Sequence, residues 1–264
     1  MSGVVSKDAT AIAFERSGTG QPLILVDGAL CYRASGPSRP LAALLSKDFT
    51  VFTYDRRGRG DSGDTAPYAV EREVEDIQAL IEEAGGSASV CGISSGAALA
   101  LEAANRGLAV EKLALYEPPF IVDDSRPAIP DGFLAQLNDA IAGGRRGDAV
   151  KLFMKLVGVP AIFVAMMRFM PAWSNLTAVA HTLPYDITIV QENQRGQPLP
   201  AKRWASATTP TLVVVGEKSP AWMRNAMHAL AAVLPNAKRR TLEGQTHMVK
   251  PKVLAPVLVE FFRG

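Results

Sequence analysis

One short stretch of this sequence places a serine between two glycines at the start of a predicted helix. Residues 92–96 read Gly-Ile-Ser-Ser-Gly, after a short apolar run and before an alanine-rich, helix-like segment. A serine on a sharp strand-to-helix turn has a strained backbone, so the residues two positions before and after it must be very small. Gly92 and Gly96 meet this demand. The pattern predicts a nucleophile at Ser94, with the backbone N–H of Ser95 at the helix start as a donor to an oxyanion.

A nucleophilic serine needs a base within hydrogen-bond reach, and histidine suits neutral pH best. The chain has three histidines, His181, His228 and His247. His228 lies inside the helix-like segment 221–234, and His181 lies in a region without predicted strands. His247 instead lies in a loop between the last strand-like segment and the C-terminal helix-like segment. We therefore predict that His247 is the base.

Five continuous apolar runs predict the strands that must position these residues, because strands buried on both faces lack a polar face. The runs are residues 22–26, 49–54, 88–91, 113–116 and 211–215. Amphipathic helical patterns lie between them. One example is residues 69–83, where apolar residues recur at helical spacing. Strands that alternate with helices are typical of βαβ units. The sequence thus predicts an α/β fold with a mostly parallel, doubly wound sheet.

The pattern changes between residues 118 and 200, where helix-like stretches are broken by Pro and Gly and no clear strand occurs. We expect residues 118–200 to form an inserted helical cap, and residues 1–117 and 201–264 to form the core domain. Large apolar and sulfur-containing side chains concentrate in the predicted cap. We expect them to form the cap's own core, or else to line an adaptable apolar pocket over Ser94. They are Phe153, Met154, Phe163, Met166, Met167, Phe169, Met170 and Trp173.

A further motif, residues 54–62, reads Tyr-Asp-Arg-Arg-Gly-Arg-Gly-Asp-Ser. It closely resembles the loop that follows the fourth strand in the α/β-hydrolase superfamily. With the serine turn and the segment 244–247, the resemblance covers nearly the whole chain outside the predicted cap. It implies that His247 is the catalytic histidine and that the backbone N–H of Ala29 is the second oxyanion donor. The sequence departs from the family at Asp27, where a histidine is common, so a carboxylate is expected near the oxyanion loop.

The acid that would orient the histidine is missing from its usual position. The superfamily usually carries this acid after the strand that corresponds to residues 211–215, where this sequence has Ser219. Ser219 could hydrogen-bond the histidine without adding charge, or Glu217 could turn toward it. Some relatives, certain haloalkane dehalogenases among them, carry the acid after an earlier strand, and Glu117 resembles that arrangement. A carboxylate that ends a buried strand usually needs a partner, so we favour Glu117.

Composition restricts the partners of this 264-residue chain. Its 28 basic and 26 acidic residues give a formal charge of +2 without a basic stripe, so we do not expect nucleic acid as a partner. The sequence shows neither a secretory signal pattern nor an apolar run long enough to span a membrane, so we expect a cytoplasmic protein. The motifs require no cofactor and no metal ion. We expect a small-molecule substrate, and the sequence leaves open whether the protein is a homodimer.

Together these residues predict acyl transfer to water by an esterase-like serine hydrolase. The expected substrate is a small carboxylic ester, lactone or thioester with an apolar part, cleaved through an acyl-enzyme. Ser94 argues against the carboxylate-nucleophile chemistry of haloalkane dehalogenases and epoxide hydrolases. A cofactor-free perhydrolase or haloperoxidase, a C–C bond hydrolase and a lyase all retain serine and histidine, so they remain alternatives. A non-catalytic receptor or scaffold on the same fold is a further alternative.

Overall fold

A computed structural model of the chain describes residues 2–264, and its centre is an eight-stranded sheet. The strand order is β1-β2-β4-β3-β5-β6-β7-β8. Neighbouring strands from β4 to β8 run parallel, whereas β1 and β2 are antiparallel additions at one edge. The strands are β1 (Ser2–Val5), β2 (Ala11–Ser17), β3 (Pro22–Val26), β4 (Thr50–Tyr54), β5 (Ala88–Ile93), β6 (Val110–Tyr116), β7 (Thr211–Gly216) and β8 (Ala237–Leu242). The predicted α/β fold with a mostly parallel sheet is confirmed.

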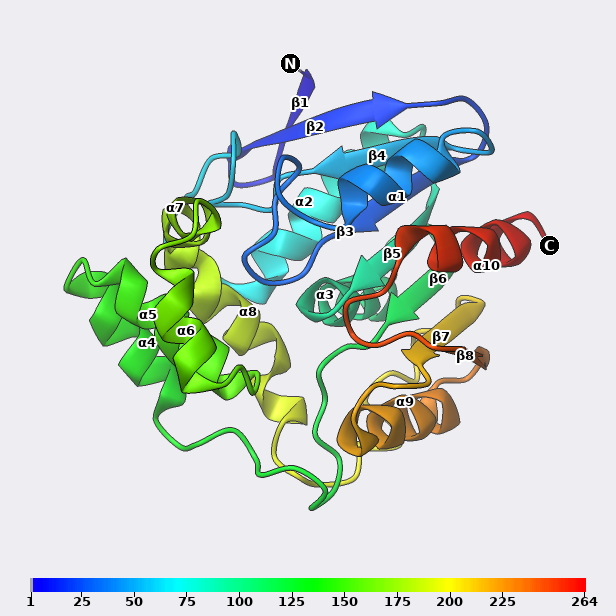
Figure 1. The fold of residues 1–264 in the computed structure, drawn as a ribbon. Coiled ribbons are helices and arrows are strands. Elements are labelled where there is room, and N and C mark those ends of the chain that lie inside the picture. Colours follow the sequence, from blue (N-terminus) through cyan, green and yellow to red (C-terminus); the bar gives the residue numbers. More distant parts are fainter. Residues whose placement is uncertain (1) are drawn as a thin grey trace.

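Helices cover both faces of the sheet, as Figure 1 shows. Helices α2, α3 and α9 pack on one face, and α1 and α10 pack on the other. No helix among residues 2–264 is long and apolar enough to cross a membrane. The helices of the sheet region are α1 (Ser38–Leu45), α2 (Val70–Glu83), α3 (Ser95–Asn105), α9 (Ala221–Val233) and α10 (Pro251–Arg263).

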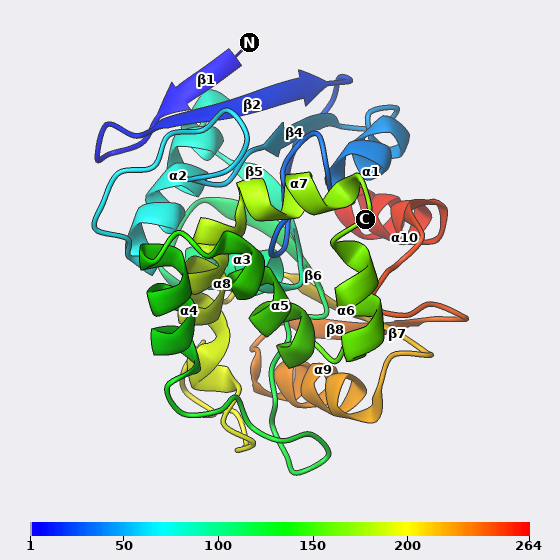
Figure 2. The ribbon, with the colours of Figure 1, turned by 60° about the vertical axis from the view of Figure 1, so that its left-hand side comes forward.

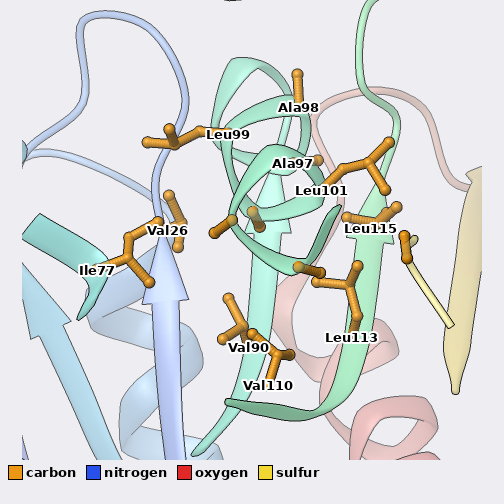
Figure 3. Packing of buried hydrophobic residues seen from close by; sticks show 14 of the residues in the cluster. Val26, Ile77, Val90, Ala97, Ala98, Leu99, Leu101, Val110, Leu113 and Leu115 are labelled. Carbon is orange, nitrogen blue, oxygen red and sulfur yellow. The ribbon is translucent and has the colours of Figure 1, made fainter. Parts of the chain in front are cut away.

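Side chains along each parallel strand alternate between two hydrophobic cores. In β3, Ile24 and Val26 point into the core shared with α2, α3 and α9, whereas Leu23 and Leu25 point into the core shared with α1 and α10. Figure 3 shows the first core, where Val26 and its neighbours on β5 and β6 surround α3. Because both faces are buried, the strands read as continuous apolar runs.

Between β6 and β7 the chain forms a group of helices with a third hydrophobic core of its own. In Figure 1 this group lies to one side of the sheet, and Figure 2 brings it forward. Helix α8 joins it to the sheet region by packing against α3 and α4. The helices are α4 (Phe133–Ala142), α5 (Arg146–Leu156), α6 (Ala161–Met167), α7 (Ala172–Ala178) and α8 (Leu183–Val190), with 3-10 turns at Ala180–Thr182 and Gln191–Asn193.

The expectation for the large apolar side chains of this region was only partly right. Phe153, Met154 and Trp173 pack against the third core. Four others, on and after α6, are more than half exposed, and they neither belong to that core nor line the cavity that contains Ser94. Helix α6 has seven residues and buries only Val164, so most of its surface faces outward. The exposed side chains are Phe163, Met166, Phe169 and Met170.

Candidate active site

Ser94 lies at the sharp turn between β5 and α3, with φ +58° and ψ −127°. A positive φ of this kind is rare for residues other than glycine, so the surroundings must enforce it. A Cβ on Gly92 would lie 2.5 Å from the Cα of Ala97, and a Cβ on Gly96 would lie 2.5 Å from the carbonyl oxygen of Asp27. Both contacts are impossible for real side chains. The two glycines therefore allow α3 to approach the sheet closely enough to hold Ser94 in this conformation.

His247 and Glu117 form a direct contact. The Nδ1 atom of His247 lies 2.8 Å from Oε2 of Glu117, whose side chain is completely buried. Glu117 follows β6 and itself has a left-handed φ of +47°, which turns the chain out of the strand. The hydroxyl of Tyr116 donates to the carbonyl oxygen of Thr246 over 2.6 Å and so ties the histidine loop to the same strand end. The ring of His247 is thus oriented by a buried carboxylate.

The other two candidates for the acid form no hydrogen bond with the histidine ring. The hydroxyl of Ser219 donates to Oε1 of Glu117 over 2.5 Å, and the backbone N–H of Gly216 donates to the same oxygen over 2.7 Å. Glu217 is exposed and accepts a hydrogen bond from the backbone N–H of Gly244 over 2.8 Å. Ser219, at the position where the acid was expected, therefore hydrogen-bonds a carboxylate at the end of the neighbouring strand.

Ser94, His247, Ala29 and Ser95 all line one cavity of about 590 Å³. Its walls come from the strand ends of the sheet and from the helical region between β6 and β7. Most of the lining is apolar, including Leu152, Phe153, Ile187 and Val190 from the helical region. The size and lining are typical of a small-molecule site.

Asp27 does not place its carboxylate in this cavity. It follows β3 and is buried, and its Oδ1 accepts a hydrogen bond from the hydroxyl of Ser38 on α1 over 2.7 Å. Burial raises the pKa of Asp27 to about 6, against the opposing effect of the Ser38 hydrogen bond. The neighbouring Gly28 must be a glycine, because a Cβ there would lie 2.9 Å from the Cβ of Ser94.

A buried ion-pair cluster supports the loop that carries Ala29. The sequence alone did not predict this cluster. Asp186 of α8 accepts hydrogen bonds from Arg56 over 2.7 Å, from Arg59 over 2.8 Å and from the Ser95 hydroxyl over 2.7 Å. Arg59 also donates to the carbonyl oxygen of Gly28 over 2.7 Å. Burial alone would raise the pKa of Asp186, but the charges of Arg59 and Arg56 hold it below its usual value.

The two arginines belong to the motif of residues 54–62, so their presence was visible in the sequence. Their partner was not, because Asp186 lies 130 residues after Arg56 in a helix with no distinguishing pattern. The cluster joins three distant segments: the arginine loop, the turn after β3, and the helix that connects the helical region to the sheet.

Comparison with known proteins gives a consistent result. A model of the alpha/beta hydrolase family matches residues 18–256. The crystal structure of an alpha/beta hydrolase from Sphaerobacter thermophilus DSM 20745 has 54% sequence identity and a TM-score of 0.91, over 99% of this chain and 100% of that chain. An enol-lactonase from Burkholderia xenovorans LB400 has 20% identity and a TM-score of 0.72 over the full length of both chains. A thermophilic esterase from Thermogutta terrifontis has 19% identity and a TM-score of 0.65, over 99% of this chain and 97% of that chain.

Proposed function

This chain belongs to the alpha/beta hydrolase family, and we propose that it is a serine hydrolase that cleaves a small carboxylic ester, lactone or thioester. The observation that carries the proposal is the 2.8 Å contact between Nδ1 of His247 and the buried carboxylate of Glu117, beside a cavity that Ser94 also lines. A histidine oriented in this way is the partner that a serine hydroxyl needs to act as a nucleophile.

In the proposed mechanism, Nδ1–H of His247 donates to Glu117, which leaves Nε2 free to accept the proton of Ser94. The Ser94 oxygen attacks the substrate carbonyl, and the resulting oxyanion accepts hydrogen bonds from the backbone N–H groups of Ala29 and Ser95. His247 then returns the proton to the leaving alcohol or thiol, and an acyl-enzyme remains on Ser94. Water, deprotonated by His247, releases the acid and regenerates the serine.

The surroundings favour this chemistry. Glu117 is fully buried and already accepts two hydrogen bonds at Oε1, so Oε2 is directed to the histidine and stabilises the imidazolium that forms. The helix α3 begins at Ser95 and presents its N-terminal dipole to the developing charge. The apolar walls from the helical region, residues 118–200, would act as a cap over the non-reacting part of the substrate.

Labelling with a fluorophosphonate probe tests the proposal directly. The intact protein is expected to gain the mass of one phosphonyl group, with the adduct on Ser94, and Ser94→Ala is expected to gain none. Hydrolysis of 4-nitrophenyl butyrate by both proteins, with folding checked by circular dichroism, supplies the second measurement. A folded protein that is neither labelled at Ser94 nor active on esters would contradict the proposal.

A further inference from the structure

Two cationic side chains line the cavity that contains Ser94, and neither forms an ion pair within residues 2–264. They are Arg126, in the loop after β6, and Lys155, in the last turn of α5. The one carboxylate lining the cavity in the described chain is Asp186, and it is already paired with Arg56 and Arg59. Among the described residues that line the cavity, no carboxylate is therefore left to pair with these two cations.

Arg126 is held in place rather than extended into solvent. Its guanidinium lies 4.3 Å from the ring centroid of Trp222, at the start of α9, which is a cation–π contact. Its Nη2 donates to the carbonyl oxygen of Leu156, the last residue of α5. Because Trp222 and α5 also line the cavity, both contacts keep the guanidinium at the cavity wall.

Arg126 retains unused hydrogen-bonding capacity in this position. Its Nε and Nη1 donate to no acceptor among residues 2–264, although the side chain is half-buried. Burial without an opposing carboxylate lowers the pKa of Arg126, because partial desolvation disfavours the charged guanidinium. A desolvated guanidinium in a largely apolar pocket attracts an anion much more strongly than an exposed one.

We infer that Arg126, assisted by Lys155, binds a carboxylate on the non-reacting part of the substrate. The substrate class is then an ester, lactone or thioester that also carries a free carboxylate, with an apolar segment between the two groups. This inference rests on the proposed function, because it specifies the substrate of the same site. Arg126 acts as a specificity-determining residue and takes no part in the chemical steps.

The test uses matched pairs of substrates that differ only in charge. These are the mono-4-nitrophenyl esters of glutaric, adipic and suberic acid. Each is compared with the 4-nitrophenyl methyl diester of the same diacid, in which a methyl ester replaces the free carboxylate. The wild-type protein is expected to favour at least one acid over its methylated form by about tenfold or more in kcat/KM, mainly through KM, as a charged hydrogen bond requires. Raising the salt concentration is expected to reduce this preference.

Variants then locate the preference. Arg126→Gln is expected to abolish it, and Lys155→Gln to reduce it by a few-fold, since an exposed cation contributes less. Arg168→Gln, an exposed arginine outside the cavity in the same helical region, is the matched control and is expected to keep the wild-type ratio. The ratio compares two substrates on one protein, so a loss of folded protein does not change it.

Two results would overturn the inference while the proposed function stands: a wild-type protein that hydrolyses both members of each pair equally, or a preference that survives in Arg126→Gln. A preference that survives in Arg126→Gln would mean that Arg126 only holds the end of α5 and does not bind the carboxylate of the substrate. If Ser94 is not labelled and no ester is hydrolysed, the proposed function fails separately. In that case, calorimetric titration with monomethyl adipate still decides the inference. It compares Ser94→Ala with the double variant that also carries Arg126→Gln. Equal affinity of the two proteins for this ligand would exclude the carboxylate site.

Discussion

Glu117 and His247 are 130 residues apart in the chain, and Oε2 of one lies 2.8 Å from Nδ1 of the other. The contact exists because β6 ends beside β7, and the loop after β8 returns across both strand ends. Oε1 of the same carboxylate accepts hydrogen bonds from Gly216 and Ser219, just where β7 ends. An acid on one strand is thus oriented by a serine on the next.

We predict that Glu117→Gln lowers kcat by about 10²- to 10⁴-fold, because the neutral amide cannot stabilise the imidazolium and favours the wrong tautomer of His247. Ser219→Ala is expected to lower kcat by about tenfold or less, since Gly216 still holds the carboxylate. Glu217→Gln is the control and is expected to stay near the wild-type rate. Steady-state kinetics on an activated ester measures all three. A Glu117→Gln protein that keeps its rate while Ser219→Ala loses it would show that the acid is assigned wrongly.

Asp186→Asn is predicted to destabilise the fold by about 3–5 kcal/mol, because it leaves the charge of Arg59 buried and unpaired and removes one of the two carboxylates that pair with Arg56, the other being Glu73. Activity should also fall in the fraction that folds, since Arg59 holds the carbonyl group of Gly28 in the loop that carries Ala29, the proposed oxyanion donor. Urea unfolding measures the first effect. Asp148→Asn, which breaks only exposed pairs, with Lys151 and Arg145, is the control and should leave the unfolding midpoint nearly unchanged. Equal midpoints for the two variants would contradict the role of the cluster.

Gly96→Ala is predicted to destabilise the protein by about 1–3 kcal/mol or to abolish labelling of Ser94, because the new Cβ meets the backbone after β3. Gly147 is a matched control, since each glycine is the second residue of its helix. The nearest atom to a Cβ on Gly147 is a ring carbon of Trp173 at 3.3 Å, a side chain that can adjust. Gly147→Ala is therefore expected to be neutral or to stabilise the helix by up to about 1 kcal/mol. Chemical denaturation and fluorophosphonate labelling compare them, and similar midpoints together with full labelling of Ser94 in both variants would refute the steric argument.

The buried carboxyl of Asp27 is predicted to make stability depend on pH. Its pKa is raised to about 6 in the folded protein, whereas in the unfolded chain the proton leaves near its usual value of 3.8. The folded state thus binds this proton more tightly, and the associated stability is present at low pH and lost as pH rises from about 4 to 6. Asp27→Asn stays neutral throughout. Between pH 4 and pH 8 the free energy of unfolding of Asp27→Asn should rise relative to that of the wild type by up to about 3 kcal/mol, since one pKa unit corresponds to about 1.4 kcal/mol.

Urea unfolding of both proteins at several pH values measures this difference, with Asp139→Asn as an exposed control. A stability difference that is the same at pH 4 and pH 8 would show that Asp27 does not titrate in this range.

Much of the sheet could be predicted because its signals are local. Strands buried on both faces must be apolar throughout, so the run 22–26 corresponds to β3 and the run 211–215 lies within β7. The turn at Ser94 is equally local, since its two glycines are required by contacts within a few residues. The short edge strand β1 was not predicted. It is stabilised by pairing with β2, and the sequence of its own four residues does not indicate that pairing.

Sequence patterns predicted the serine turn, the candidate histidine and the alternation of strands and helices, because each depends on neighbours in the chain or on burial of a whole segment. They could not show which carboxylate contacts His247, where the carboxyl of Asp27 points, or that Asp186 pairs with two arginines. Those contacts join residues more than ten positions apart, and they depend on distances of a few ångströms between side chains. The structure also showed that Phe163, on the short helix α6, and Phe169, just after it, are exposed, since which side of a short segment is buried depends on what packs against it. The fold was therefore readable from residue patterns, whereas the site's acid and its charge balance required the packing of distant segments.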